Sequence, residues 1–199
     1  MSGFGMDGTA APVEVDAYTA AYRVSGTVHT RFTRVADIVN QVTGSHLAID
    51  RAQITEFANA TTAVAAPVAM VAVSEILVLI APNLVGEASR DMRIMKRPVL
   101  AQMALPPLRV TGRIHVAPGG RPIDGLLNVP DRFVAMTDAT ISSGAHPDLE
   151  LSVPALAVRR DLAHILLVAD DENPEQLLAD VLDERTAEVW LRGTGEEPA

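Results

Sequence analysis

The 199-residue sequence predicts a mainly β fold with minor α content: two tandem, small, antiparallel β-barrel-like repeats related by pseudo-twofold symmetry, followed by a C-terminal helix. Three observations support this prediction. The chain is 48% hydrophobic but only 4% aromatic, so its core consists mainly of Val, Ala, Leu and Ile, which favours strands. Several stretches alternate between apolar and polar residues. The pattern of residues 22–54 also returns in residues 108–141.

The repeat is clearest in its first strand-like segment. Tyr-Arg-Val-Ser-Gly-Thr-Val-His-Thr (22–30) is matched by Leu-Arg-Val-Thr-Gly-Arg-Ile-His-Val (108–116). One additional residue enters the second copy at the turn 118–120, after which the match resumes. The match indicates a duplicated domain, because its period is too long for a solenoid array. The identical pairs are Arg23/Arg109, Val24/Val110, Gly26/Gly112, His29/His115, Arg34/Arg121, Asp37/Asp124, Ala48/Ala135, Ala52/Ala139 and Ile54/Ile141.

Changes in composition divide the chain into segments. Each repeat would hold a strand, a short helix and four further strands, and about 60–70 residues form only a marginal core. We therefore expect the repeats to pack against each other, either as separate barrels or as one interlocked sheet system. The expected segments are a flexible N-terminal tail (1–19), repeat 1 (20–82), a linker (83–107), repeat 2 (108–171), a C-terminal helix or strand (172–192) and a tail (193–199).

The first strand of each repeat is expected to be half-buried. Val24 and Val28 share one face with Gly26, whereas His29 lies on the other face. A glycine at the inward position of both copies suggests a bend or a close backbone approach. The spacing of Val35, Ile38, Val39 and Val42 then predicts a short amphipathic helix that ends at Gly44.

Two short strands should follow each helix, over 47–50 with 52–57 and over 133–137 with 139–143. Residues 63–81 are then almost continuously apolar and, at about 19 residues, could be long enough to span a membrane. The matching stretch of the second repeat contains Arg159-Arg160-Asp161, which cannot sit in lipid. We therefore predict a hairpin of buried strands in each copy, turning at Ser74-Glu75 and at 159–161, and no transmembrane segment.

Residues 83–107 combine positive charge with methionines in an otherwise acidic protein. The segment is either a plain connector, with one helical turn near 87–96, or a partner-binding segment, because Met-rich surfaces adapt to varied partners. Asn173, Pro174 and Gln176 predict the start of the C-terminal helix. The candidate partner-binding residues are Arg90, Met92, Arg93, Met95, Lys96 and Arg97.

Composition also excludes several functions. The net charge of −9 argues against a nucleic-acid partner, which requires a basic face. There is no cysteine, so disulfides, thiolate metal sites and a cysteine nucleophile are excluded, and the chain fits the cytoplasm. Residues 1–13 lack the basic and apolar regions of a signal peptide.

The candidate ligand-binding residues are those that the duplication repeats: His29, His115, Arg34 and Arg121. If the copies face each other, the groove between them could bind a small ligand or a metal. Two histidines alone are an incomplete zinc site, so we expect no resident metal or cofactor. The alternative is that both histidines are semi-exposed strand residues inherited by duplication. Ser143 lies close to His146, but no G-x-S-x-G elbow surrounds it, and we expect no catalytic residues.

The repeated pattern of an apolar-x-Gly-x-apolar-His strand, Arg-x-x-Asp and apolar-Ala-apolar-x-x-Ala-x-Ile resembles a small bacterial β-barrel domain of unknown function. It is also loosely similar to Sm-like barrels. The resemblance covers both repeats and implies a small barrel fold. Because the chain lacks the Sm-type Asp/Asn signature for uridine binding, the resemblance implies no RNA-binding function.

Three functional hypotheses follow from the sequence. The leading one is a non-enzymatic binding or assembly protein that acts through contacts with a protein partner or with copies of itself, because so apolar a chain calls for further burial. The alternative is a small-ligand or metal-binding protein that uses the groove between the repeats. The third is an enzyme whose site is divided between the two copies.

Overall fold

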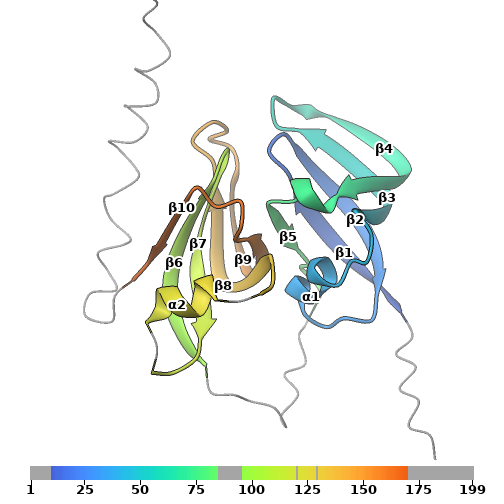
Figure 1. Cartoon of the computed structure of the whole chain (residues 1–199). Helices are drawn as coiled ribbons and strands as arrows, with labels where there is room; N and C mark the ends of the chain where they lie inside the picture. The colour runs from blue at the N-terminus through green and yellow to red at the C-terminus, as the bar shows by residue number, and fades with distance from the viewer. Residues whose placement is uncertain (1–9, 85–95, 120, 129, 170–199) are drawn as a thin grey trace, which may run out of the picture.

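A single antiparallel sheet runs through the described part of the chain (Figure 1). The computed structural model describes residues 10–84, 96–119, 121–128 and 130–169. The strands are β1 (Ala11–Tyr18), β2 (Tyr22–Thr30), β3 (His46–Glu56), β4 (Asn59–Ala72), β5 (Val78–Ile80), β6 (Arg97–Leu105), β7 (Leu108–Val116), β8 (Phe133–Ser142), β9 (Glu150–Arg159) and β10 (Ile165–Val168). Two short helices, α1 (Val35–Asn40) and α2 (Pro122–Leu127), and the 3-10 turn η1 (Val73–Glu75) complete the fold. The predicted mainly β class with minor helix is confirmed.

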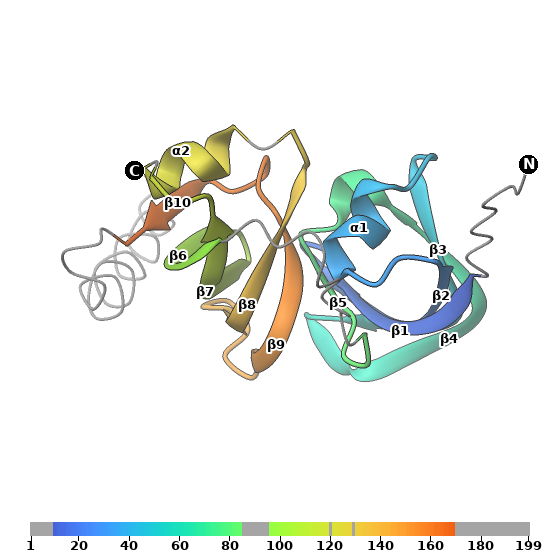
Figure 2. The same ribbon diagram turned by 90° about the horizontal axis from the view of Figure 1, so that it is seen from below.

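The two halves of the chain have the same strand order. The 10-stranded sheet runs β10-β6-β7-β8-β9-β5-β1-β2-β3-β4, so each half has its last strand beside its first. The registers agree as well, because Leu47 pairs with Val71 in the first half and the matched Val134 pairs with Val158 in the second. The halves meet where β9 pairs with β5, and Figure 2 shows them side by side. The sheet is not closed, because β4 and β10 stand at its two ends.

A bulge bends the sheet at the same place in both halves. The pairing register shifts between Ser25 and Thr27 in β2, and at the matched place in β7. A Cβ atom on Gly26 would lie 2.6 Å from the carbonyl oxygen of Asp50, which is closer than such atoms approach. A Cβ on Gly112 would lie 2.9 Å from the Cβ of Ala139. The predicted close backbone approach at these glycines is confirmed.

The strand that faces each bulge is continuous. Arg51 in β3 and Asp138 in β8 occupy matched positions, and both have positive φ, at 50° and 48°. A positive φ in a residue other than glycine marks a sharp local turn of the chain. The two short strands predicted at each of these places are therefore one bent strand, because the break in the apolar pattern is a single left-handed residue within it.

The predicted hairpins are wrong in their pairing. The chain does turn at Ser74-Glu75, within η1, but β4 and β5 do not pair with each other. β5 instead pairs with β1 and β9, and β10 pairs with β6. All residues of β5 are buried, as suits a strand with a neighbour on both sides and a core on both faces.

Two strands lie in segments that we expected to be irregular. β1 occupies residues 11–18 of the predicted tail, and β6 occupies residues 97–105 of the predicted linker. Both show the alternation of a strand, and β6 buries Val99, Ala101 and Met103. The helix α1 is confirmed, although it ends at Asn40 and not at Gly44. The predicted helical turn near 87–96 and the segment 172–192 lie outside the residues described, apart from Lys96.

Two hydrophobic cores lie in the molecule, and each takes side chains from both halves. The core of the second half includes Tyr18, Val78 and Ile80 from the first half. The core of the first half includes Phe133 and Ala157 from the second half. The predicted packing of the two halves against each other is therefore achieved by exchange of core side chains. In the part of the chain that the structure describes, no helix is long and apolar enough to cross a membrane.

The bulge generates a prediction about stability. Replacement Gly26→Ala should lower the free energy of unfolding by about 1–3 kcal/mol, because the new methyl group overlaps the Asp50 carbonyl and Ile49. Urea denaturation measures this change. The matched control is Gly44→Ala, whose Cβ would meet nothing within 4 Å. Equal stabilities of the two variants would contradict the close approach at the bulge.

Candidate functional site

The joint between the halves, where β9 pairs with β5, contains a buried arginine that contacts both halves. Arg159, at the end of β9, has a side chain that is only 6% exposed. Its guanidinium donates hydrogen bonds to the Asp161 carboxylate at 2.8 and 3.2 Å and to the carbonyl oxygen of Val73 in the other half. It also lies 5.4 Å from the ring centre of Phe133. One side chain therefore connects η1 with the start of β8 and the end of β9.

The charge of Arg159 also acts on its acidic partner. Burial acts to raise the pKa of Asp161, but the hydrogen bonds and the positive charge of Arg159 outweigh burial and hold the pKa below its ordinary value. Asp161 therefore stays ionised in the folded protein. Asp161, in the same half, balances the charge of Arg159. The hydrogen bond from Arg159 to the Val73 carbonyl then holds the first half in position.

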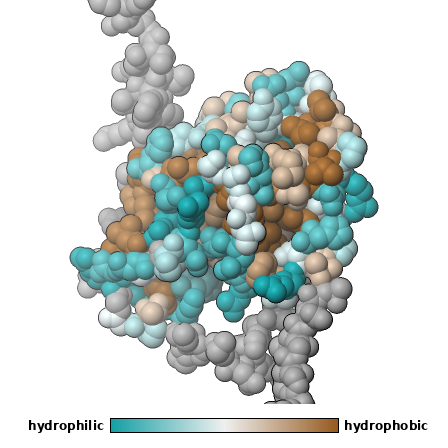
Figure 3. All heavy atoms as spheres, turned by 45° about the vertical axis from the view of Figure 1, so that its right-hand side comes forward, coloured by the Kyte–Doolittle hydropathy of each residue, from teal (hydrophilic) through white to brown (hydrophobic). Residues whose placement is uncertain are grey.

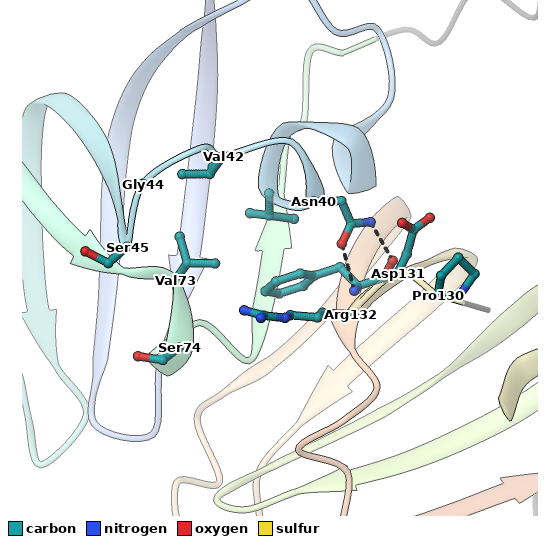
Figure 4. A pocket seen from close by; sticks show the side chains of 11 residues that line it. Asn40, Val42, Gly44, Ser45, Val73, Ser74, Pro130, Asp131 and Arg132 are labelled. Carbon is teal, nitrogen blue, oxygen red and sulfur yellow. Dashed lines mark hydrogen bonds between the residues drawn. The ribbon is translucent and has the colours of Figure 1, made fainter. Parts of the chain in front are cut away.

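A second polar contact crosses the joint beside a cavity (Figure 4). The Asn40 side chain, at the end of α1, donates a hydrogen bond to the Phe133 carbonyl at 2.8 Å and accepts one from the Phe133 amide at 3.0 Å. The cavity next to this contact has a volume of about 470 Å³. Ser45, Ser74 and Asp131 contribute its polar lining. Asn40 satisfies both backbone groups of one residue, so it fixes α1 against the start of β8.

A groove between the halves contains two of the four predicted ligand-binding residues. Its volume is about 330 Å³, and Arg34 and His115 both line it, one from each half. Lys96 and Asp37 line it as well, so the lining carries charges of both signs. The His115 ring nitrogen Nε2 lies 2.9 Å from the Thr137 hydroxyl. The groove can therefore offer cationic groups to a small anionic ligand.

The other two predicted residues do not line this groove. His29 lies 3.5 Å from the Asp50 carboxylate on the exposed face of the first half. Arg121 makes two hydrogen bonds to Asp124, at 2.8 and 3.0 Å. These bonds raise the pKa of Arg121 and lower that of Asp124. His29 and His115 lie beside different partners in separate halves, so the structure does not bring them together.

The remaining predicted sites are only partly described. Of the candidate partner-binding residues, Lys96 lines the groove and Arg97 begins β6, whereas those at 90–95 lie outside the described residues. Ser143 accepts a hydrogen bond from the His146 backbone amide at 3.2 Å, and the His146 ring lies 5.3 Å from the ring centre of Phe57. Within the described ranges, no three His, Cys, Asp or Glu side chains gather to hold a metal ion.

The end strand β4 exposes apolar side chains that we expected to be buried. Val64, Val68 and Met70 are 58%, 50% and 61% exposed. Figure 3, turned toward this half, shows apolar residues at the surface. Native proteins usually protect an end strand with charges or a cover, because its unpaired backbone groups invite another strand. Among the residues described, Pro67 interrupts the edge of β4, but the exposed part that follows it carries neither charge nor cover.

A shallow groove of about 400 Å³ runs beside the end of β4. Ile54 and Ala69 line it from β3 and β4, and Tyr22 lines it from the start of β2. We did not predict this surface from the sequence, although residues 63–72 contain no charged residue. That lack of charge was taken as a sign of burial within the chain, but it is equally a sign of an uncovered edge.

Comparison with known proteins supplies no family for this chain: no family model, no curated protein and no solved structure matches it.

The joint generates the second prediction. Replacement Arg159→Met should lower the free energy of unfolding by about 1–3 kcal/mol, because it leaves the buried Val73 carbonyl without its side-chain donor. Urea denaturation again provides the measurement. Arg23→Met is the control, since Arg23 forms a half-exposed pair with Asp16 that contributes less than about 1 kcal/mol. A loss no larger than that of the control would show that Arg159 does not hold the joint.

Proposed function

We propose that this chain is a non-enzymatic assembly protein of the cytoplasm that acts through protein–protein contacts made by the exposed edge of β4. The observation that carries the proposal is that, within the described ranges, the exposed end of β4 around Val68 and Met70 has neither charge nor cover. An apolar edge strand is suited to pairing with another strand, because backbone hydrogen bonds supply affinity and side chains supply specificity. The absence of cysteine supports a cytoplasmic location.

The same proposal includes a duplicated, barrel-like building unit. It is supported by the shared strand order, by the matched registers and by the bulges at Gly26 and Gly112. The positive φ angles of Arg51 and Asp138 add a match that the residue types themselves do not reveal. We propose that the halves descend from one five-stranded unit with a curved, barrel-like sheet.

A charge placed on the edge tests this function. Met70→Lys should weaken association with a second copy or with any captured partner by about tenfold or more, because a lysine without a partner would have to leave water. Native mass spectrometry and affinity isolation with the tagged full chain measure both kinds of association.

The control Ala145→Lys adds the same charge in the exposed loop between β8 and β9. Association that survives Met70→Lys unchanged, or that is lost equally in both variants, would refute a docking role for β4. Correct folding of each variant is checked by its urea midpoint, since an exposed substitution should change stability by less than about 0.5 kcal/mol.

The groove between the halves supports a second candidate function, binding of a small anion. The observation in its favour is that Arg34, Lys96 and His115 line one groove of about 330 Å³. Cationic side chains from different elements that face a common space are typical of anion sites. The acidic Asp37 and Asp131 in the same lining limit the net positive charge, so we place this function second.

Titration of the full chain with inorganic phosphate, followed by calorimetry, tests the second candidate. Arg34→Gln should weaken phosphate binding by about tenfold, as expected for loss of a charge-assisted hydrogen bond. Arg121→Gln is the matched control, because it removes the same charge outside the groove. Absence of measurable binding, or equal effects of the two variants, would contradict the anion site.

A further inference from the structure

We infer that the partner of β4 is strand β10 of a second copy of this chain, so that copies join head to tail and repeat between molecules the pairing that β9 and β5 make within one. This inference rests on the proposed function of the β4 edge and names its partner. The starting observation is that the joint between the halves uses one end strand of each half. The two end strands left over are the counterparts of those that pair.

The two strands that pair between the halves, β5 and β9, correspond residue by residue to the two end strands, β10 and β4. β5 and β10 are the last strands of their halves, and each pairs with the first strand of its half in the same register: Leu79 with Ala17, and Leu166 with Met103. β4 and β9 are likewise counterparts, because Val71 lies opposite Leu47 as Val158 lies opposite Val134. Transfer of the β5–β9 register to the free ends places Ile165 opposite Val71, Leu166 opposite Met70 and Leu167 opposite Ala69.

The extent of the new ladder follows from a matched pair of prolines. β9 pairs with β5 only over Leu156–Val158, immediately after Pro154. Proline has no N–H to donate and interrupts an edge. Pro67 occupies the matched position in β4, so the pairing edge of β4 is the part that follows it. This is the part beside the shallow groove, and it includes Met70.

The groove beside β4 is an open corner of the first half. The matching corner of the second half is filled by side chains of the first half. In the second half, Ile141 and Leu156 are fully buried because Tyr18, Val78 and Ile80 of the other half enter their core. Their counterparts in the first half are only partly buried and line the open groove of about 400 Å³. The counterparts of the entering side chains are Ala104, Ile165 and Leu167, and Ile165 is 42% exposed.

Across the proposed contact, a smaller side chain on one molecule is matched by a larger side chain on the other. Where the entering half has Tyr18, the second copy would bring only Ala104, but the receiving corner has Tyr22 in the place of the smaller Leu108. Tyr22 is 44% exposed, whereas Leu108 is 2% exposed. Volume lost on one side and gained on the other is what well-packed cores tolerate.

The contact between molecules would lack the polar bonds of the joint within the chain. The counterpart of Arg159 is Ala72 and the counterpart of Asn40 is Leu127, so neither side chain can form the matching bond. Leu127 is 57% exposed and supplies an apolar contact in place of the amide. We therefore expect the joint within the chain to form first and the contact between chains to be reversible. A contact between unlike ends produces a ring when its rotation closes and a filament when it does not.

Engineered cysteines test the register, because the chain has no cysteine of its own. The Arg159 amide donates a hydrogen bond to the Leu77 carbonyl at 2.8 Å, so these two residues form a hydrogen-bonded pair. Hydrogen-bonded and non-hydrogen-bonded pairs alternate along an antiparallel ladder, so Ile80 and Leu156 form a non-hydrogen-bonded pair. Its intermolecular counterpart is Ala69 with Leu167, at a Cα separation of about 4.5 Å, which suits a disulfide. Full-length Ala69→Cys and Leu167→Cys proteins are mixed in equal amounts under mild oxidation.

The mixture should form a disulfide-linked dimer of the two different proteins, whereas neither protein alone should. Thr62→Cys mixed with Leu167→Cys is the off-register control and should remain unlinked. Met70→Cys mixed with Leu166→Cys tests the next pair along the ladder, in case a variant of the first pair does not fold. Dimers formed by Ala69→Cys alone would indicate that β4 pairs with β4 of another copy. Absence of a disulfide in both mixed pairs would show that β10 does not pair with β4. Either result overturns the inference.

The outcome is separable from that of the proposed function. If Met70→Lys abolishes association with another protein while no mixed pair is linked, β4 is a docking edge for a different partner and only the head-to-tail inference fails. If the mixed pairs are linked, native mass spectrometry of the unmodified chain should show species of more than one copy, in a single ring or in a series.

Discussion

The rest of the structure depends on the short ladder between β9 and β5. Each half alone has about the number of residues at which a hydrophobic core becomes marginal. The ladder places β5 at the centre of the sheet, where Leu79 enters one core and Val78 enters the other. Arg159 and Asn40 then fix the angle between the halves through backbone carbonyl and amide groups. The two cores are thereby completed by each other, and neither half is expected to fold stably alone.

The same ladder explains why the ends of the sheet carry an apolar surface. Each half contributes side chains to the core of the other across this ladder, and only the inner edge of each half is paired there. The outer edges remain as a donor, β10, and an acceptor, β4. The net charge of −9 favours the solubility of a chain with such edges. The exposed Val68 and Met70 are therefore a consequence of the architecture.

The local structure was largely predictable, and the long-range pairing was not. Alternation predicted β2 and β7, and the matched Gly26 and Gly112 predicted a close approach, because these features act within a few residues. Strands adjacent in sequence were assumed to pair, but β4 and β5 separate since β5 gains more by entering two cores. Of the four residues predicted to line a groove between the halves, only Arg34 and His115 do so. Convergence of His29 and His115 depended on halves that face each other. Instead, His29 lies beside Asp50 and His115 beside Thr137, each within its own half.

Hydrogen exchange of the full chain at low and at high protein concentration tests the central claim most directly. The account predicts that backbone amides of β5 and of residues 156–158 are protected at both concentrations, because their ladder lies within one molecule. The outward amides of Met70 in β4 and Leu166 in β10 should gain protection only at high concentration, because the amides on either side of them already bond to β3 and β6 within the molecule. Rapid exchange throughout β5, or edge amides that exchange equally at both concentrations, would contradict the claim that one pairing mode joins both the halves and the molecules.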